Sequence, residues 1–102
     1  MPRYFPDELL RRLRNDIAWV SLLEHLDWPH KLREGQLAFM CPRCQEIRSA
    51  VNPVTNLGRC FRCEINFNPI DFTMAVQQSD FVAAVHYLEP LLSRRPRPTA
   101  SR

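Results

Sequence analysis

The sequence predicts one small α+β domain, in which a short antiparallel sheet is flanked by an N-terminal pair and a C-terminal pair of helices. Three observations support this prediction. The 102 residues suffice for one hydrophobic core but not for two. Apolar residues recur at helical spacing over 6–26 and 69–92, whereas 31–68 contains short apolar runs separated by turn residues. Four cysteines fall in that middle stretch, in two closely spaced pairs.

The N-terminal pair of helices is predicted from charge and capping. The first helix is expected over residues 6–15, with acidic residues in its first turn and arginines in its last, as the helix dipole favours. The second is expected to begin at Asp16, a good N-cap residue type, and to run to about Leu26. The Trp-Pro pair at 28–29 ends it, because the residue before a proline avoids the helical conformation.

The middle of the chain predicts three to five short antiparallel strands. Apolar runs at 37–40, 50–51 and 57–61 are the candidate strands, and the turn residues at 52–56 separate the last two. We expect one face of this sheet to pack against the apolar faces of the helices and the other face to stay free for a ligand.

Two more helices are expected after the sheet. Pro69 suits the first turn of a helix that continues through residue 76. Ser79 and Asp80 are the predicted caps of the last helix, and Pro90 is expected to end or kink it. The buried face of that helix is predicted to consist of Phe81, Ala84, Val85 and Leu88.

Charge is distributed unevenly, although the formal net charge is only +3. Residues 31–63 carry six bases and two acids, and residues 64–93 carry four acids and no base. Residues 94–102 contain four arginines and no core-forming side chain, so we expect a domain over 1–93 and a disordered basic tail over 94–102. Arginine makes up 13 of the 14 bases, and it suits contacts to phosphate and stacking on bases. A GC-rich genome explains the preference for arginine equally well, but not its clustering.

The chain has no feature of a membrane or exported protein. No apolar run reaches the roughly 18–20 residues that a membrane span needs, and charged residues follow the first six instead of an apolar export signal. A secreted disulfide scaffold usually carries such a signal and more cysteines. We therefore expect a cytoplasmic protein with reduced cysteines and no membrane partner.

The cysteines form the pattern C-x2-C-x15-C-x2-C, made by Cys41, Cys44, Cys60 and Cys63. A two-residue gap turns both sulfurs of a pair toward one point, and two such turns joined by a short sheet complete a tetrahedral four-thiolate shell. This shell fits Zn²⁺ best and is closed to substrate, so the sequence predicts a zinc ribbon with one structural zinc ion per chain. A domain this small needs such a stabilising element. A four-thiolate iron–sulfur centre has similar ligands and stays open as an alternative.

Basic and aromatic residues interleave around the cysteines. This composition suits single-stranded nucleic acid, because any nucleobase can stack on an aromatic ring and any phosphate can pair with a lysine or arginine side chain. The candidate nucleic-acid-binding residues are Lys31, Arg33, Arg43, Arg48, Arg59, Phe61 and Arg62. No arrangement of residues indicates a catalytic site, so we expect a binding protein and not an enzyme.

Several sequence motifs follow one another in a familiar order. They are Asp-Ile-Ala-Trp at 16–19, Arg-Glu-Gly at 33–35, Cys-Pro at 41–42, Cys-Phe-x-Cys at 60–63, Pro-Ile-Asp-Phe at 69–72 and the helix-forming stretch 79–88. In this order, residues 3–92 resemble the N-terminal zinc-binding domain of bacterial DnaG-type DNA primases. The resemblance implies a zinc ribbon that binds single-stranded template DNA in replication or primer synthesis, with a polymerase, primase or other replication protein as its partner.

The chain departs from that family at several positions. The family usually has histidine as its second metal ligand, where this chain has Cys44. The family's Thr-Pro-Ser-Phe is replaced by Ile-Arg-Ser-Ala at 47–50, and its glycine-rich turn by residues 64–68. Within these 102 residues we expect no counterpart of the primase polymerase domain, whose acidic residues hold Mg²⁺. We therefore expect this chain to act in trans with a catalytic partner.

Two other functions stay open. In one, the protein is an adaptor whose ribbon or apolar helices dock another protein, and the basic face is incidental. In the other, it is a duplex-DNA-binding regulator, in which Arg11, Arg12 and Arg14 of the first helix contact phosphates, although no helix-turn-helix is evident.

Overall fold

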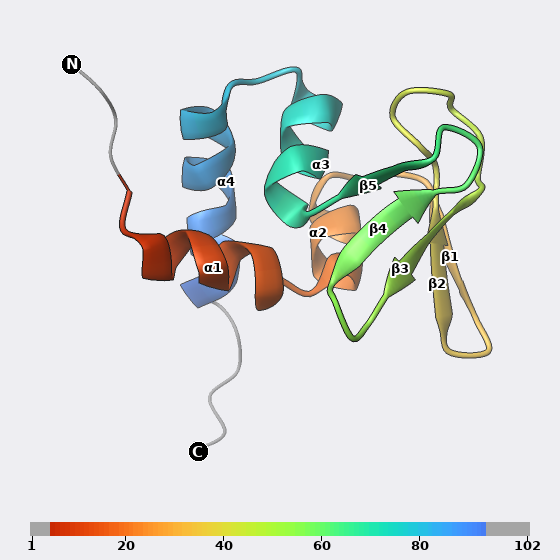
Figure 1. Ribbon diagram of the computed structural model, residues 1–102, viewed down its shortest axis with the longest axis horizontal. Helices are drawn as coiled ribbons and strands as arrows, with labels where there is room; N and C mark the ends of the chain where they lie inside the picture. Colours follow the sequence, from red (N-terminus) through yellow and green to blue (C-terminus); the bar gives the residue numbers. More distant parts are fainter. Residues whose placement is uncertain (1–4, 94–102) are drawn as a thin grey trace.

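The computed structural model describes residues 5–93, which form four helices and a five-stranded antiparallel sheet (Figure 1). The helices α1 (Asp7–Asn15) and α2 (Trp19–His25) precede the sheet, and α3 (Pro69–Gln77) and α4 (Phe81–Ser93) follow it. This confirms the predicted α+β fold, in which one pair of helices precedes the sheet in the sequence and another pair follows it. The predicted tail at 94–102 lies outside the described residues.

The strands pair in chain order, each with the next. They are β1 (His30–Arg33), β2 (Gln36–Phe39), β3 (Ser49–Asn52), β4 (Leu57–Cys60) and β5 (Ile65–Phe67). The first and last were not among the candidate strands, because neither His-Lys-Leu-Arg nor Ile-Asn-Phe contains a continuous apolar run. The alternation in Ile-Asn-Phe at 65–67 was the signal that could have revealed β5, whereas β1 is exposed along most of its length and shows no such pattern.

The register of the strands separates a buried face from an uncovered one. Side chains alternate along each strand, so residues paired across the sheet share a face. The buried face holds Leu37, Phe39, Ser49, Val51, Gly58, Cys60 and Phe67. One row crosses all five strands on the opposite face, and we call it the open-face row: Lys31, Ala38, Ala50, Arg59 and Asn66. Helices α1, α3 and α4 lie to one side of the sheet (Figure 1), which leaves this row uncovered.

Aromatic packing joins the helices to the buried face of the sheet. Phe72 of α3 is fully buried, and its ring centroid lies 5.0 Å from that of Trp19 on α2 and 5.2 Å from that of Phe39 on β2. Trp28 and Phe67 contact the same ring at 6.1 and 6.0 Å. One side chain therefore ties α2, α3, β2 and β5 into a single core.

Asn56, in the turn between β3 and β4, holds the connection between α1 and α2. Its side-chain Nδ2 donates to the carbonyl oxygens of Arg14, at 2.8 Å, and Ile17, at 3.0 Å. Its own carbonyl oxygen accepts a hydrogen bond from Trp19 Nε1, at 3.0 Å. The turn predicted from its polar composition thus also satisfies polar groups of the helical layer.

The prediction that Asp16 caps the second helix is wrong. Asp16 is the C-terminal cap of α1, where its N–H donates to the Arg12 carbonyl oxygen at 2.7 Å. Its carboxylate turns back to the Arg12 side chain, at 3.7 Å. The second helix begins three residues later, after Ala18, whose backbone is extended.

The last two helices follow the prediction with two differences. Asp80 caps α4 through a 2.9 Å bond from the Ala83 N–H, as expected. Pro90, however, does not end α4, which continues to Ser93. A proline near the end of a helix removes only one hydrogen bond, and the burial of Leu92 keeps the last turn on the core. Phe81, predicted to be buried, is 40% exposed, and its ring packs edge-on against that of Phe5.

Within residues 5–93, no helix combines the length and the apolar character that crossing a membrane requires.

A side chain at Gly58 is predicted to overpack the core. A methyl group at this position would lie 2.6 Å from Cζ of Phe39 and 3.1 Å from Cη2 of Trp19. We expect Gly58→Ala to lower the free energy of unfolding by about 1–3 kcal/mol, the usual cost of overpacking. Urea denaturation measures this cost.

A second background tests the cause. Phe39→Leu removes the ring atoms that the new methyl group would meet, so Gly58→Ala should cost clearly less in that background. An equal cost in both backgrounds would contradict the steric explanation.

Candidate metal centre and nucleic-acid interface

The two cysteine pairs lie in two turns of the same backbone shape, the first knuckle (41–45) and the second knuckle (60–64). In the first, the Gln45 N–H donates to the Cys41 carbonyl oxygen at 2.8 Å; in the second, the Glu64 N–H donates to the Cys60 carbonyl oxygen at 2.7 Å. Gln45 and Glu64 both adopt left-handed backbone conformations, with φ of 63° and 59°. Glycine adopts this conformation most easily. Glu64 adopts it at the position where the primase family has a glycine-rich turn.

The two knuckles bring the four cysteine sulfurs together, as the spacing predicts. All four Sγ atoms lie within 4.8 Å of one another, and none is in a disulfide. The Cys41 and Cys63 sulfurs are 3.9 Å apart, and those of Cys44 and Cys60 are 3.7 Å apart. A tetrahedral ion with metal–sulfur bonds of about 2.3 Å places its ligands about 3.8 Å apart. The four cysteines can therefore hold one metal ion.

Backbone groups and burial set the acidity of the thiols. Burial raises the pKa of Cys41, and burial together with the neighbouring thiols raises the pKa of Cys63 to about 12. Burial also acts to raise the pKa of Cys60, but the Cys63 N–H, 3.3 Å from its sulfur, and neighbouring hydroxyl and thiol groups lower it to about 6. One thiolate thus forms readily at Cys60, while further thiolates need a cation beside them.

Ser49 is part of this centre, and the sequence reasoning did not single it out. It lies directly opposite Cys60 in the β3–β4 register. Its hydroxyl is buried and makes no hydrogen bond of regular distance and angle, but its position beside Cys60 is among the contributions that lower the pKa of that thiol. Donors of this kind, just outside the ligand shell, orient and stabilise metal ligands.

The predicted nucleic-acid-binding residues fall into two groups. Lys31 and Arg59 belong to the open-face row, and Arg33 pairs with Gln36 beside it. The ring of Phe61 is 62% exposed and borders the same face. A shallow hollow of about 510 Å³ lies there, over β3, β4 and β5, and its lining includes Gln36, Ala50, Asn52, Arg59, Phe61 and Asn66.

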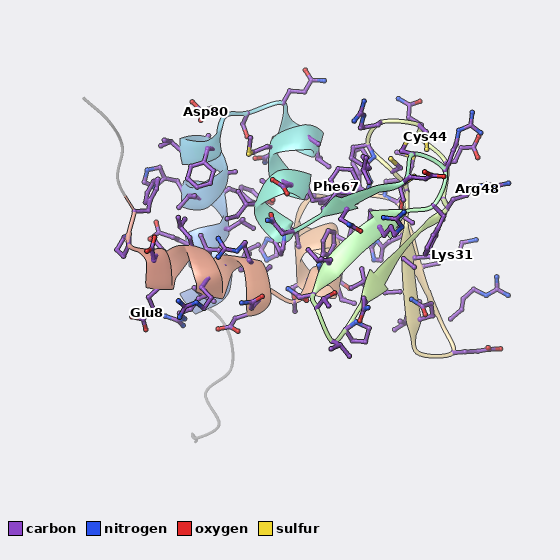
Figure 2. The ribbon with its side chains drawn as sticks, viewed as in Figure 1. Glu8, Lys31, Cys44, Arg48, Phe67 and Asp80 are labelled. Carbon is purple, nitrogen blue, oxygen red and sulfur yellow. The ribbon has the colours of Figure 1, made fainter. Side chains whose placement is uncertain are left out.

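The second group lies at the knuckles. Arg43 is exposed in the first knuckle, where its N–H donates to the Cys41 sulfur at 3.3 Å. Arg48 and Arg62 both form ion pairs with Glu46. In Figure 2, Lys31 and Arg48 lie at the edge of the sheet farthest from α1 and α4, whereas Glu8 lies on α1 and the capping Asp80 just before α4. Residues 31–63, which form most of the sheet and its knuckles, carry six bases and two acids.

Comparison with known proteins finds no family model that matches the chain and no curated protein that is similar to it. The resemblance to the primase zinc-binding domain therefore rests on the sequence motifs alone.

Ser49→Ala is expected to weaken metal binding about tenfold, because the substitution removes a donor to the Cys60 thiolate. Without this donor the pKa of Cys60 rises, so protons compete with the metal at higher pH and the deficit should grow as the pH falls toward 6. Competition with a chromophoric chelator measures the affinity. Ser21→Ala, at an exposed position on α2, is the control and should leave it unchanged. Equal affinities in the two variants would remove Ser49 from the centre.

Proposed function

We propose that this chain is a non-catalytic, zinc-dependent module that binds single-stranded DNA across the open face of its sheet. The observation that carries the proposal is the open-face row, with basic side chains on β1 and β4, together with the exposed ring of Phe61 beside it. A sheet that presents cations and a ring on an uncovered face suits a strand whose bases are unpaired.

The centre of the row supports this proposal. Ala38 and Ala50 occupy the middle of the face, and small side chains leave room for a base to lie flat against the sheet. Arg59 lies beside them, and its Nη1 donates to Asn66 Oδ1 at 3.4 Å, which directs the guanidinium along the sheet. A base in the hollow would then meet Phe61 on one side and the Arg59 guanidinium on the other.

We assign zinc to the four cysteines. A shell of four sulfurs close to tetrahedral spacing is the ligand set that Zn²⁺ prefers, and it has no open position for a substrate. The role of the ion is structural: it would hold the knuckles together at the end of the sheet. Structural zinc in small domains supplies about 10–16 kcal/mol of apparent binding energy.

We assign any synthesis chemistry to a partner, such as a polymerase, a primase or another replication protein. Asp71, Asp80 and Glu89 lie on or beside α3 and α4, and Glu34, Glu46 and Glu64, which lie at the sheet, form no group of three potential metal ligands among the described residues. The module would present a template strand, and its partner would extend the primer. This division of work agrees with the resemblance to the primase zinc-binding domain.

Purified protein is expected to contain one zinc ion per chain by elemental analysis. Cys60→Ser should lose the metal and unfold the sheet, because a hydroxyl is a poor ligand for zinc and the second knuckle depends on Cys60. Circular dichroism and proton NMR measure the unfolding. Iron in the folded protein, or a folded sheet without any metal, would refute the assignment.

Phe61→Ala is expected to weaken binding to a single-stranded oligonucleotide by about 1–3 kcal/mol, the energy of stacking one base on an aromatic side chain. Phe81→Ala is the matched control, since Phe81 is a partly exposed ring on α4, away from the sheet.

Arg59→Gln should flatten the dependence of log K on log salt by up to about one unit. Fluorescence anisotropy over a range of salt concentrations measures both effects.

The same titrations separate the competing functions. Tighter binding to duplex than to single strands would favour a regulator that uses Arg11, Arg12 and Arg14. No binding to either would favour a protein adaptor, and Leu32, exposed on the edge strand β1, would then be the first residue to substitute.

A further inference from the structure

The carboxylate of Glu46 lies between two arginines at the knuckle end of the sheet. Its Oε1 is 3.2 Å from Arg48 Nε, and its Oε2 is 3.2 Å from Arg62 Nη1. Each oxygen therefore contacts a different guanidinium. The side chains of Glu46, Arg48 and Arg62 are 42%, 68% and 58% exposed, so this triad is open to solvent.

Backbone contacts hold the two arginines near each other, independently of Glu46's side chain. The Phe61 N–H donates to the Arg48 carbonyl oxygen at 3.2 Å, which joins the second knuckle to the segment before β3. The Cys41 N–H donates to the Glu46 carbonyl oxygen at 3.0 Å, which joins Glu46 to the first knuckle. The backbones of the two arginines are thus held close together by contacts that do not involve the Glu46 side chain, and both guanidinium groups reach the same carboxylate.

Two converging guanidinium groups can bind an oxyanion that offers two oxygens. Arginine recognises carboxylates and phosphates with the same paired geometry. An exposed ion pair adds little net stability, because water competes for both charges. A phosphate group from a ligand can therefore take the place of the Glu46 carboxylate.

We propose that Arg48 and Arg62 form a binding site for one backbone phosphate of the strand, and that Glu46 occupies this site in the free protein and lowers the affinity. The inference rests on the proposed function. The location supports it, because Phe61 immediately precedes Arg62 and bonds to Arg48 through its N–H. A nucleotide whose base stacks on Phe61 would place a phosphate at the adjacent arginines.

The test compares Glu46→Gln with Glu34→Gln in binding a single-stranded oligonucleotide at low salt. Glu34 is exposed in the turn between β1 and β2, so its substitution removes the same charge from another part of the basic sheet end. We expect Glu46→Gln to raise the affinity about five- to tenfold, and Glu34→Gln less than twofold. The salt dependence should steepen by about 0.7–1.4 units in Glu46→Gln, as one or two added contacts to a single strand predict.

Two further measurements test whether the gain comes from a phosphate contact at these arginines. Arg62→Gln in the Glu46→Gln background should cancel the gain. An abasic strand should keep the gain from Glu46→Gln, because it retains the phosphates, but should lose the effect of Phe61→Ala. Metal content and the melting curve of each variant show that the knuckles remain intact.

The outcomes separate the two proposals. Equal gains in the Glu46→Gln and Glu34→Gln variants, with wild-type binding retained, would overturn the phosphate site and leave the proposed function standing. A gain that survives Arg62→Gln, or that disappears on the abasic strand, would also overturn it. A failure of both wild type and Glu46→Gln to bind any strand would overturn both proposals.

Discussion

The packing of four aromatic rings around Phe72 decides how the sheet faces the rest of the molecule. Phe39 and Phe67 reach this ring from β2 and β5, while Trp19 reaches it from α2. Because strands alternate their side chains, turning these two phenylalanines inward turns Ala38 and Asn66 outward. The composition of the uncovered face is thus a consequence of the core. A slip of one residue in the register would exchange the two faces.

The candidate metal centre and the uncovered face share the same strands. Cys60 ends β4 on the buried side, and Arg59, one residue earlier, points to the open side. The candidate ligand and the candidate contact to the strand are therefore neighbours on one strand. An ion that fixes the second knuckle would also fix Phe61 and Arg62, which lie between two of its ligands. On this proposal the metal acts on binding through the positions of these side chains, without contacting nucleic acid.

Local patterns in the sequence predicted most of the framework. The spacing of the cysteines sufficed because a two-residue gap determines the turn almost alone, and Pro69 marked the start of α3 because proline favours a first helical turn. Long-range contacts could not be predicted in this way. Asp16 could not be excluded as a cap without knowing that its carboxylate turns back to Arg12. The pairing of Arg48 and Arg62 with Glu46 depends on how the knuckles pack, which no local pattern encodes.

The hydrogen bonds of Asn56 have a consequence for how this fold can vary. Turns between strands usually tolerate insertions, because their residues bond to little else. The turn between β3 and β4 differs, since its last residue holds the backbone of Arg14 and Ile17. A change in its length would withdraw that contact from the helices as well as alter the hairpin. The exposed turn at Glu34 and Gly35 makes no such contact among the described hydrogen bonds. Inserted residues or an attached label should therefore be tolerated at this turn.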